Sequence, residues 1–116
     1  MYGLTVRWSL AQAAPESAKE LREYVVGPSL VRFSGMDGLR FKTWRMRAGE
    51  WFEGTYVFAT AAARDGFEES FRGKAATAPV TVLIGSPPVS IERFEVVGVA
   101  EGGAGFAAGP GPGDGA

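Results

Sequence analysis

The chain has 116 residues and a formal net charge of −1, and it contains neither cysteine nor histidine. The length suits one domain, and the balanced charge argues against general attraction to nucleic acid or anionic membranes. Without Cys or His, no disulfide, Cys/His zinc site, thiol nucleophile or Ser-His-Asp triad can form, so an acid or base must be Asp, Glu, Lys or Tyr.

The N-terminus has no basic region followed by a continuous apolar run, and no stretch approaches the roughly 20 apolar residues that a membrane span needs. A cytoplasmic protein without membrane contact is therefore expected. The first element is a strand over residues 2–10. Its odd-numbered positions are mostly polar, and its even-numbered positions carry Tyr2, Leu4, Val6, Trp8 and Leu10. This period of two is typical of a half-buried strand.

A helix is expected from Pro15, because proline is tolerated at the first helical position. Pro28 has no N–H group and crowds the carbonyl of Tyr24, so the helix should end or kink at Gly27-Pro28. A second helical piece should cover residues 29–33, followed by a turn over residues 34–38.

The next stretch, residues 38–58, is predicted to be a hairpin with its turn at residues 48–50 and a returning strand over 51–59. Thr60 is then the expected N-cap of a helix that runs to about Arg72, and Gly73 is expected to end it. Residues 78–85 fit either a strand or a short helix that starts at Pro79.

The last strand is expected over residues 89–99, with Phe94 and Val96 pointing into the core. Residues 101–116 are rich in Gly, Ala and Pro, a composition that cannot repay the entropy of ordering, and they should form a disordered tail. The domain is thus expected over residues 1–100.

The predicted order is β-α-β-β-α-(short helix)-β. This is the α+β split βαβ, or ferredoxin-like, arrangement: a four-stranded antiparallel sheet with two helices on one face. The other face would carry apolar groups without a helix to cover them, namely Thr55, Val57, Val97 and Val99. We therefore expect a homodimer formed through that sheet face.

The hairpin face with the most unusual composition carries Arg40, Lys42, Trp44, Gly54, Tyr56 and Phe58. Buried charge has to be compensated, so one interpretation is a ligand cavity between this face and the helices, with Tyr24 placed near its edge by the kink. The alternative is that the cations reach the rim while the aromatic side chains only fill the core.

A wider group of cations, Arg32, Arg40, Lys42, Arg45 and Arg47, could bind an anionic or enolate oxygen, although a solvated strand surface explains the last two equally well. The strand Gly54–Phe58 partly matches the aromatic strand of RNA-recognition motifs. Glu53 stands where that motif has a basic residue, so no nucleic-acid partner is expected.

The motifs Gly38-Leu39-x-x-Lys42-x-Trp44 and Gly54-x-Tyr56-x-Phe58, with Leu83-Ile84-Gly85-x-Pro87-Pro88 further on, resemble the YdhR-like monooxygenases of the dimeric α/β-barrel superfamily. The resemblance covers residues 2–99. It implies a homodimer in which two sheets form a barrel with the helices outside and a cavity between each sheet and its own helices. Relatives include cofactor-independent oxygenases of antibiotic biosynthesis that oxidise phenolic polycyclic substrates to quinones.

The first functional hypothesis is accordingly a cofactor-independent monooxygenase that acts on an aromatic or polyketide-like small molecule, without metal. The catalytic residues would be Lys42, which stabilises the substrate anion, and Tyr56, which donates a hydrogen bond. The substrate-binding residues would be Trp44, Phe58, Arg40 and Tyr24. The alternatives are a non-redox cyclase or isomerase with Tyr or Lys as acid and base, and a non-catalytic dimer that binds small molecules.

Overall fold

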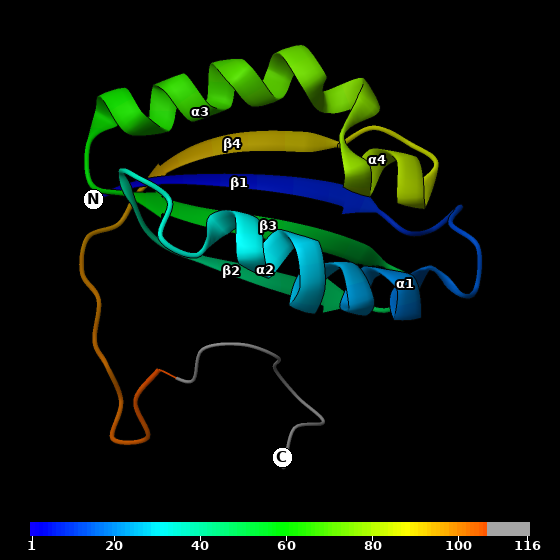
Figure 1. The fold of residues 1–116 in the computed structure, drawn as a ribbon, viewed down its shortest axis with the longest axis horizontal. Helices are drawn as coiled ribbons and strands as arrows, with labels where there is room; N and C mark the ends of the chain where they lie inside the picture. The colour runs from blue at the N-terminus through cyan, green and yellow to red at the C-terminus, as the bar shows by residue number, and fades with distance from the viewer. Residues whose placement is uncertain (107–116) are drawn as a thin grey trace.

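The computed structural model describes residues 1–106, which form a four-stranded antiparallel sheet in the order β2-β3-β1-β4. The helices lie on one face of this sheet (Figure 1). This strand order and the sequence of elements are those of the split βαβ arrangement, so the predicted ferredoxin-like α+β fold is confirmed. The part of the predicted disordered tail that covers residues 107–116 lies outside the described residues.

The central strand β1 (Tyr2–Ser9) pairs with both β3 and β4. As the alternation predicted, Leu4 and Val6 are fully buried and Trp8 is nearly so. The indole nitrogen of Trp8 donates a 3.0 Å hydrogen bond to Thr81 Oγ1, and this hydroxyl donates to the carbonyl of Ala75 at 2.7 Å. A short polar chain therefore ties the middle of the sheet to the segment between the last two helices.

One bent helical segment follows: α1 (Ser17–Tyr24), a π-helical turn η1 (Val25–Ser29) and α2 (Leu30–Phe33). Gly27 departs from helical dihedrals, with φ −104° and ψ −105°, immediately before Pro28. The kink therefore lies where the proline predicted it. Pro15, however, is not the first helical residue, because residues 14–17 close a separate turn through the Ser17 N–H and the Ala14 carbonyl.

The hairpin consists of β2 (Leu39–Arg47) and β3 (Trp51–Phe58), joined by a turn in which Gly49 has a φ of +79°. The register shifts between Leu39 and Phe41, so Arg40 is the extra residue of a β-bulge. Beyond the bulge the pairing is regular, with Lys42 opposite Tyr56. The simple alternation that placed Arg40 beside Lys42 on one face is therefore broken.

The helix α3 (Ala61–Lys74) begins as predicted, with the Thr60 hydroxyl accepting a 3.1 Å hydrogen bond from the Ala63 N–H. Its predicted end at Gly73 is wrong, because Gly73 keeps a negative φ and the chain continues into the 3₁₀ turn η2 (Ala75–Thr77). The ambiguous segment 78–85 is a short helix, α4 (Pro79–Ile84), which ends on Gly85 with φ +93°.

The last strand, β4 (Ser90–Glu95), is shorter than the predicted span 89–99. Phe94 pairs with Gly3, and its ring lies so close that a Cβ atom at Gly3 would come within 2.0 Å of it. Gly3 and Phe94 lie on the face opposite Leu4, so the prediction that Phe94 enters the core is wrong. Ile91 and Arg93 take the helix side instead, where Arg93 reaches Glu68 on α3.

The face of the sheet opposite the helices is called the open face below. Val57 on this face is only 2% exposed, whereas Val97 and Val99, which were predicted to extend it, lie beyond β4 and are exposed. Residues 101–106 follow, and the ring of Phe106 lies 6.3 Å from that of Phe41. Within residues 1–106, no helix combines the length and apolar character needed to cross a membrane.

Candidate functional site

A cavity of about 40 Å³ lies between the helix-covered face of the sheet and the helices. Strands β1, β2 and β3 supply its floor, and the bent segment, α3 and α4 supply its walls. Most of the lining is aromatic or aliphatic. The lining residues are Trp8, Tyr24, Ser29, Arg32, Phe33, Lys42, Trp44, Phe52, Gly54, Tyr56, Phe67, Phe71, Ala78, Pro79 and Val80. They include two basic side chains and no carboxylate, which makes the lining suited to an aromatic ligand with negative charge.

Lys42 extends from β2 into this cavity and ends among three aromatic rings. Its Nζ lies 3.6 Å from the ring centre of Phe33, 4.4 Å from that of Tyr56 and 4.7 Å from that of Trp44. Aromatic faces attract cations, so these rings partly replace the water that surrounds an exposed ammonium group. Within the described part of the chain, Lys42 forms no ion pair.

Burial and, to a smaller extent, the positive charge of Arg32 together lower the pKa of Lys42 from 10.5 to about 6. The amine is thus largely uncharged at pH 7. A neutral amine carries a free lone pair, which can accept a proton or attack an electrophile. Lys42 is therefore the residue of the cavity with the clearest capacity for chemistry.

Tyr56 is the cross-strand partner of Lys42 and is only 3% exposed. Burial raises the pKa of its phenol, with opposing effects from Arg32 and Tyr24, so the hydroxyl remains a proton donor at neutral pH. Gly54 makes room for this pair, because a Cβ atom there would lie 3.2 Å from Lys42 Cε and 3.3 Å from the Tyr56 hydroxyl. The side chains of Lys42 and Tyr56 thus occupy the space beside Gly54.

The bent segment is attached to the cavity floor by a single side-chain hydrogen bond. Trp44 Nε1 donates to the hydroxyl of Ser29, at 3.0 Å, and Ser29 is only 2% exposed. Ser29 is the last residue of the π-helical turn, directly after Pro28. The kink therefore determines how closely this wall of the cavity approaches β2.

The structure brings together four of the six predicted site residues. Lys42, Trp44, Tyr56 and Tyr24 all line the cavity. Phe58 is 1% exposed and stacks against Tyr56 with ring centres 6.2 Å apart, but it packs in the core behind the cavity wall. Arg40 is exposed and does not line the cavity. It is the extra residue of the β-bulge, so its side chain does not follow the alternation of β2.

Two lining residues from α2 were not among the predicted site residues. Phe33 forms the ring closest to Lys42 Nζ, and the guanidinium carbon of Arg32 lies 4.8 Å from the centre of the same ring. Arg32 was recognised only as one member of a general group of cations. The π-helical turn shifts the rotational phase of α2 relative to α1, so helical spacing counted from Tyr24 could not have placed these two side chains.

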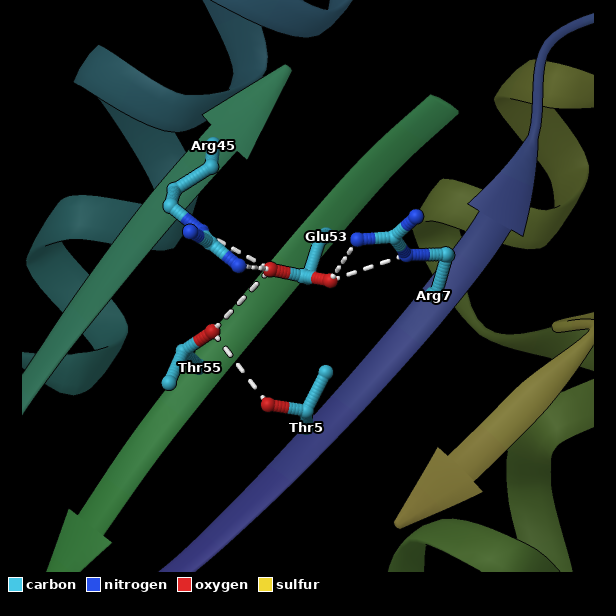
Figure 2. A network of polar contacts seen from close by, with 5 residues as sticks. All are labelled: Thr5, Arg7, Arg45, Glu53 and Thr55. Atoms are coloured by element: carbon cyan, nitrogen blue, oxygen red, sulfur yellow. Dashed lines mark hydrogen bonds and ion pairs between the residues drawn. The ribbon is translucent and has the colours of Figure 1, made fainter. Parts of the chain in front are cut away.

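A second polar centre lies on the open face and was not predicted. Figure 2 shows Arg7 from β1 and Arg45 from β2 approaching the carboxylate of Glu53 from opposite sides. Arg7 donates to Oε2 through Nε at 2.9 Å and Nη2 at 2.7 Å, and Arg45 donates to Oε1 through Nε at 2.8 Å and through Nη2. Thr55 also contacts Oε1, at 3.4 Å.

This arrangement leaves Glu53 only 1% exposed on a face that no helix covers. Burial raises the pKa of Glu53, but the hydrogen bonds and charges of Arg45 and Arg7 outweigh that effect and hold the pKa below its usual value. The carboxylate is therefore saturated and ionised. It is a structural anion that fixes two guanidinium groups in place, and it has no free lone pair directed at a ligand.

Solved structures share this fold. No protein-family model and no curated protein sequence matches the chain. A Nitrosomonas europaea protein of unknown function is 21% identical, with a TM-score of 0.58, over 85% of this chain and 91% of its own. Rv0793 from Mycobacterium tuberculosis is 17% identical, with a TM-score of 0.58, over 86% of this chain and 98% of its own.

A monooxygenase of Streptomyces coelicolor, solved in complex with nanaomycin D, is 15% identical to this chain. Its TM-score is 0.60, over 85% of this chain and 89% of its own. At these identities the similarities establish a common fold for the three proteins and this chain.

Proposed function

We propose that this protein is a cofactor-independent monooxygenase of the YdhR-like kind, acting on a phenolic aromatic or polyketide-like small molecule. The observation that carries the proposal is the buried amine of Lys42 in a cavity with aromatic walls, together with Tyr56 and without a carboxylate. The S. coelicolor monooxygenase, solved with nanaomycin D, adds support because it has the same fold.

In the proposed reaction Lys42 accepts the proton of a substrate phenol, and the resulting phenolate supplies electrons to O₂. A ring CH₂ group becomes a quinone carbonyl: one oxygen atom enters the product, and the other leaves as water with the two hydrogens. The protonated Lys42 and the guanidinium of Arg32 stabilise the anion, Tyr56 donates a hydrogen bond and Trp44 stacks on the ring. In this proposal Arg32 replaces Arg40 as the substrate-binding arginine, since Arg32 lines the cavity.

The cavity is closed to such a substrate in the described conformation. Its volume of about 40 Å³ accommodates a few water molecules, whereas sites for drug-sized ligands occupy roughly 300–1,000 Å³. The bent segment is the wall that can open, because only the Ser29–Trp44 hydrogen bond joins its π-helical turn to β2 by side chains. Substrate binding should therefore separate Ser29 from Trp44.

We further propose that two copies associate through the open face. Phe94 and Phe41, both partly exposed, give this face an apolar region beside the Glu53 network, and a domain of this size buries only a modest core by itself. A symmetric contact would bury the region against its copy. Light scattering at micromolar concentration should give twice the monomer mass; the monomer mass would contradict the proposal.

The function is tested by measuring O₂ uptake with a panel of hydroxylated anthrones. Wild-type protein should consume O₂ at a rate that rises as the pH passes through about 6, because the neutral amine is the base. Lys42→Met should abolish uptake and Tyr56→Phe should reduce it, while Lys74→Met, at an exposed lysine, is the matched control. Uptake that survives both site substitutions would exclude this assignment.

A non-redox cyclase or isomerase is the second candidate, because Lys42 and Tyr56 also form a base and an acid on neighbouring strands. It predicts product formation at an unchanged rate under nitrogen. If no substrate turns over but an aromatic ligand quenches tryptophan fluorescence, the protein is a small-molecule binder.

A further inference from the structure

We propose that Lys42 also captures carbonyl compounds covalently, forming an imine with an aldehyde or ketone that carries an aromatic ring and an acidic group. This activity goes beyond the proposed oxygenation and does not depend on it. An imine requires an uncharged amine, a carbonyl and a proton donor, and it requires no oxygen. The arrangement around Lys42 supplies the first and the third from the protein.

The amine of Lys42 differs from every other lysine amine of the chain. The sequence contains three lysines, of which Lys19 and Lys74 are exposed on helices. Lys42 alone lies in a cavity, with Nζ 3.6 to 4.7 Å from three ring centres. No carboxylate lines that cavity, so nothing there holds the amine in its charged form as a salt bridge would.

The groups that face Lys42 favour the neutral amine before reaction and a neutral imine nitrogen after it. Arg32 on α2 and burial lower the pKa of Lys42 to about 6, so most of the amine is free at pH 7. The other titratable groups that line the cavity are the phenols of Tyr24 on α1 and Tyr56 on β3. The imine nitrogen would occupy the same ring-lined space, and a neutral imine carries no charge that burial or Arg32 would oppose.

The lining also indicates which carbonyl compound would fit once the bent segment has opened, because the cavity of about 40 Å³ is too small for an aromatic ligand in the described conformation. The aromatic walls favour a flat ring, and the Arg32 guanidinium stacks over the same Phe33 ring that Lys42 contacts. An acidic group on the ligand would lie opposite Arg32 while its carbonyl reaches Lys42. A substituted benzaldehyde with a carboxylate has both features in one small molecule.

The protein and the carbonyl compound supply every group that imine formation needs. The Lys42 lone pair attacks the carbonyl carbon, forming a C–N bond and a carbinolamine. The carbinolamine then loses its hydroxyl as water, with a proton from the Tyr56 hydroxyl, and the nitrogen gives its remaining proton back to the Tyr56 phenolate. The net change is amine plus carbonyl giving imine plus water. Tyr56 suits this role because its raised pKa keeps it protonated at neutral pH.

The experiment is reductive trapping of the full chain at pH 7 with 4-formylbenzoate and cyanoborohydride, followed by peptide mass mapping. Cyanoborohydride supplies the hydride that converts the imine into a stable secondary amine. A lysine with a pKa near 10.4 is less than about 0.1% neutral at pH 7, and a lowered pKa costs some nucleophilicity. Lys42 should therefore be labelled about ten- to a hundredfold faster than Lys19 or Lys74.

Two variants provide controls. Lys42→Met should remove the preferred adduct, and Lys74→Met should leave it unchanged. Tyr56→Phe should slow labelling of Lys42 several-fold without changing that of Lys19. The mapping on wild-type protein needs no variant to fold: labelling of Lys42 no faster than the two exposed lysines would overturn the proposal. Loss of O₂ uptake with intact trapping, or the reverse, separates this activity from the oxygenation.

Discussion

Replacing Lys42 by methionine should change how the stability of the protein depends on pH. In the folded protein, burial together with the charge of Arg32 lowers the pKa of this lysine from 10.5 to about 6. Between those pH values the unfolded chain binds one more proton than the folded protein. Raising the pH therefore stabilises the folded wild type by about 1.4 kcal/mol per pH unit, and the variant lacks this gain.

The sign follows from which state holds the proton. Below pH 6 the lysine is protonated in both states, and the folded protein bears the full cost of a buried ammonium group. Above about pH 10 it is neutral in both states, and that cost is gone. From pH 7 to pH 9 the wild type should thus gain about 2.7 kcal/mol relative to Lys42→Met, or about 10 °C in midpoint temperature for a domain of this size.

Urea unfolding followed by far-ultraviolet circular dichroism at pH 6, 7, 8 and 9 measures this difference. Few other side chains affect this pH range, because the chain has no His and no Cys, the side chains that ordinarily titrate nearest to neutral pH. Lys74→Met is the matched control and should run parallel to the wild type. Parallel curves for Lys42→Met as well would refute the neutral buried amine.

Three further substitutions test the surroundings. Gly54→Ala adds a Cβ atom 3.2 Å from Lys42 Cε and should cost about 1–2 kcal/mol in urea unfolding; an unchanged midpoint would mean that the cavity has spare room. Glu53→Gln should cost about 2 kcal/mol at pH 7, and the cost should vanish at acid pH as the wild-type carboxylate protonates through its lowered pKa; a cost independent of pH would contradict the ionised carboxylate. Ser29→Ala removes the 3.0 Å hydrogen bond to Trp44 and should cost about 1 kcal/mol and shift tryptophan emission, whereas an identical spectrum would show that the bond does not hold the wall.

The fold could be predicted from the sequence because short-range patterns in the chain mark most of its helices and strands. The alternation in residues 2–10, the Gly27-Pro28 interruption and the Thr60 cap each act through neighbours in the chain. The structure has them in β1, at the kink and at the start of α3. The order of such elements is enough to select the split βαβ arrangement.

The errors occur where a non-local contact overrides a local pattern. One extra residue in β2 moved Arg40 off the cavity face, and no periodicity marks a bulge. The apolar side chain of Phe94 predicts a core position, but the register of β4 against β1 places Phe94 opposite Gly3 on the open face. Strand register depends on pairing across the sheet, which a single sequence does not contain.

The two polar centres of the hairpin are separated by the same alternation that builds it. Glu53 and Lys42 lie on adjacent strands, and opposite charges on one face of such a pair of strands attract each other. On the open face Glu53 of β3 lies opposite Arg45 of β2. On the helix side Tyr56 of β3 lies opposite Lys42 of β2. The sheet therefore stands between the carboxylate and the amine.

Because the sheet separates Glu53 from Lys42, each of the two groups has a different set of neighbours. On the open face the carboxylate meets two guanidinium groups and is held ionised, while on the helix side burial and the charge of Arg32 lower the pKa of the lysine. A bulge between Lys42 and Arg45 would shift one of them to the other face and bring the lysine toward the acid. The regular register from Phe41 to Arg47 is thus what preserves the reactivity on which both proposed activities depend.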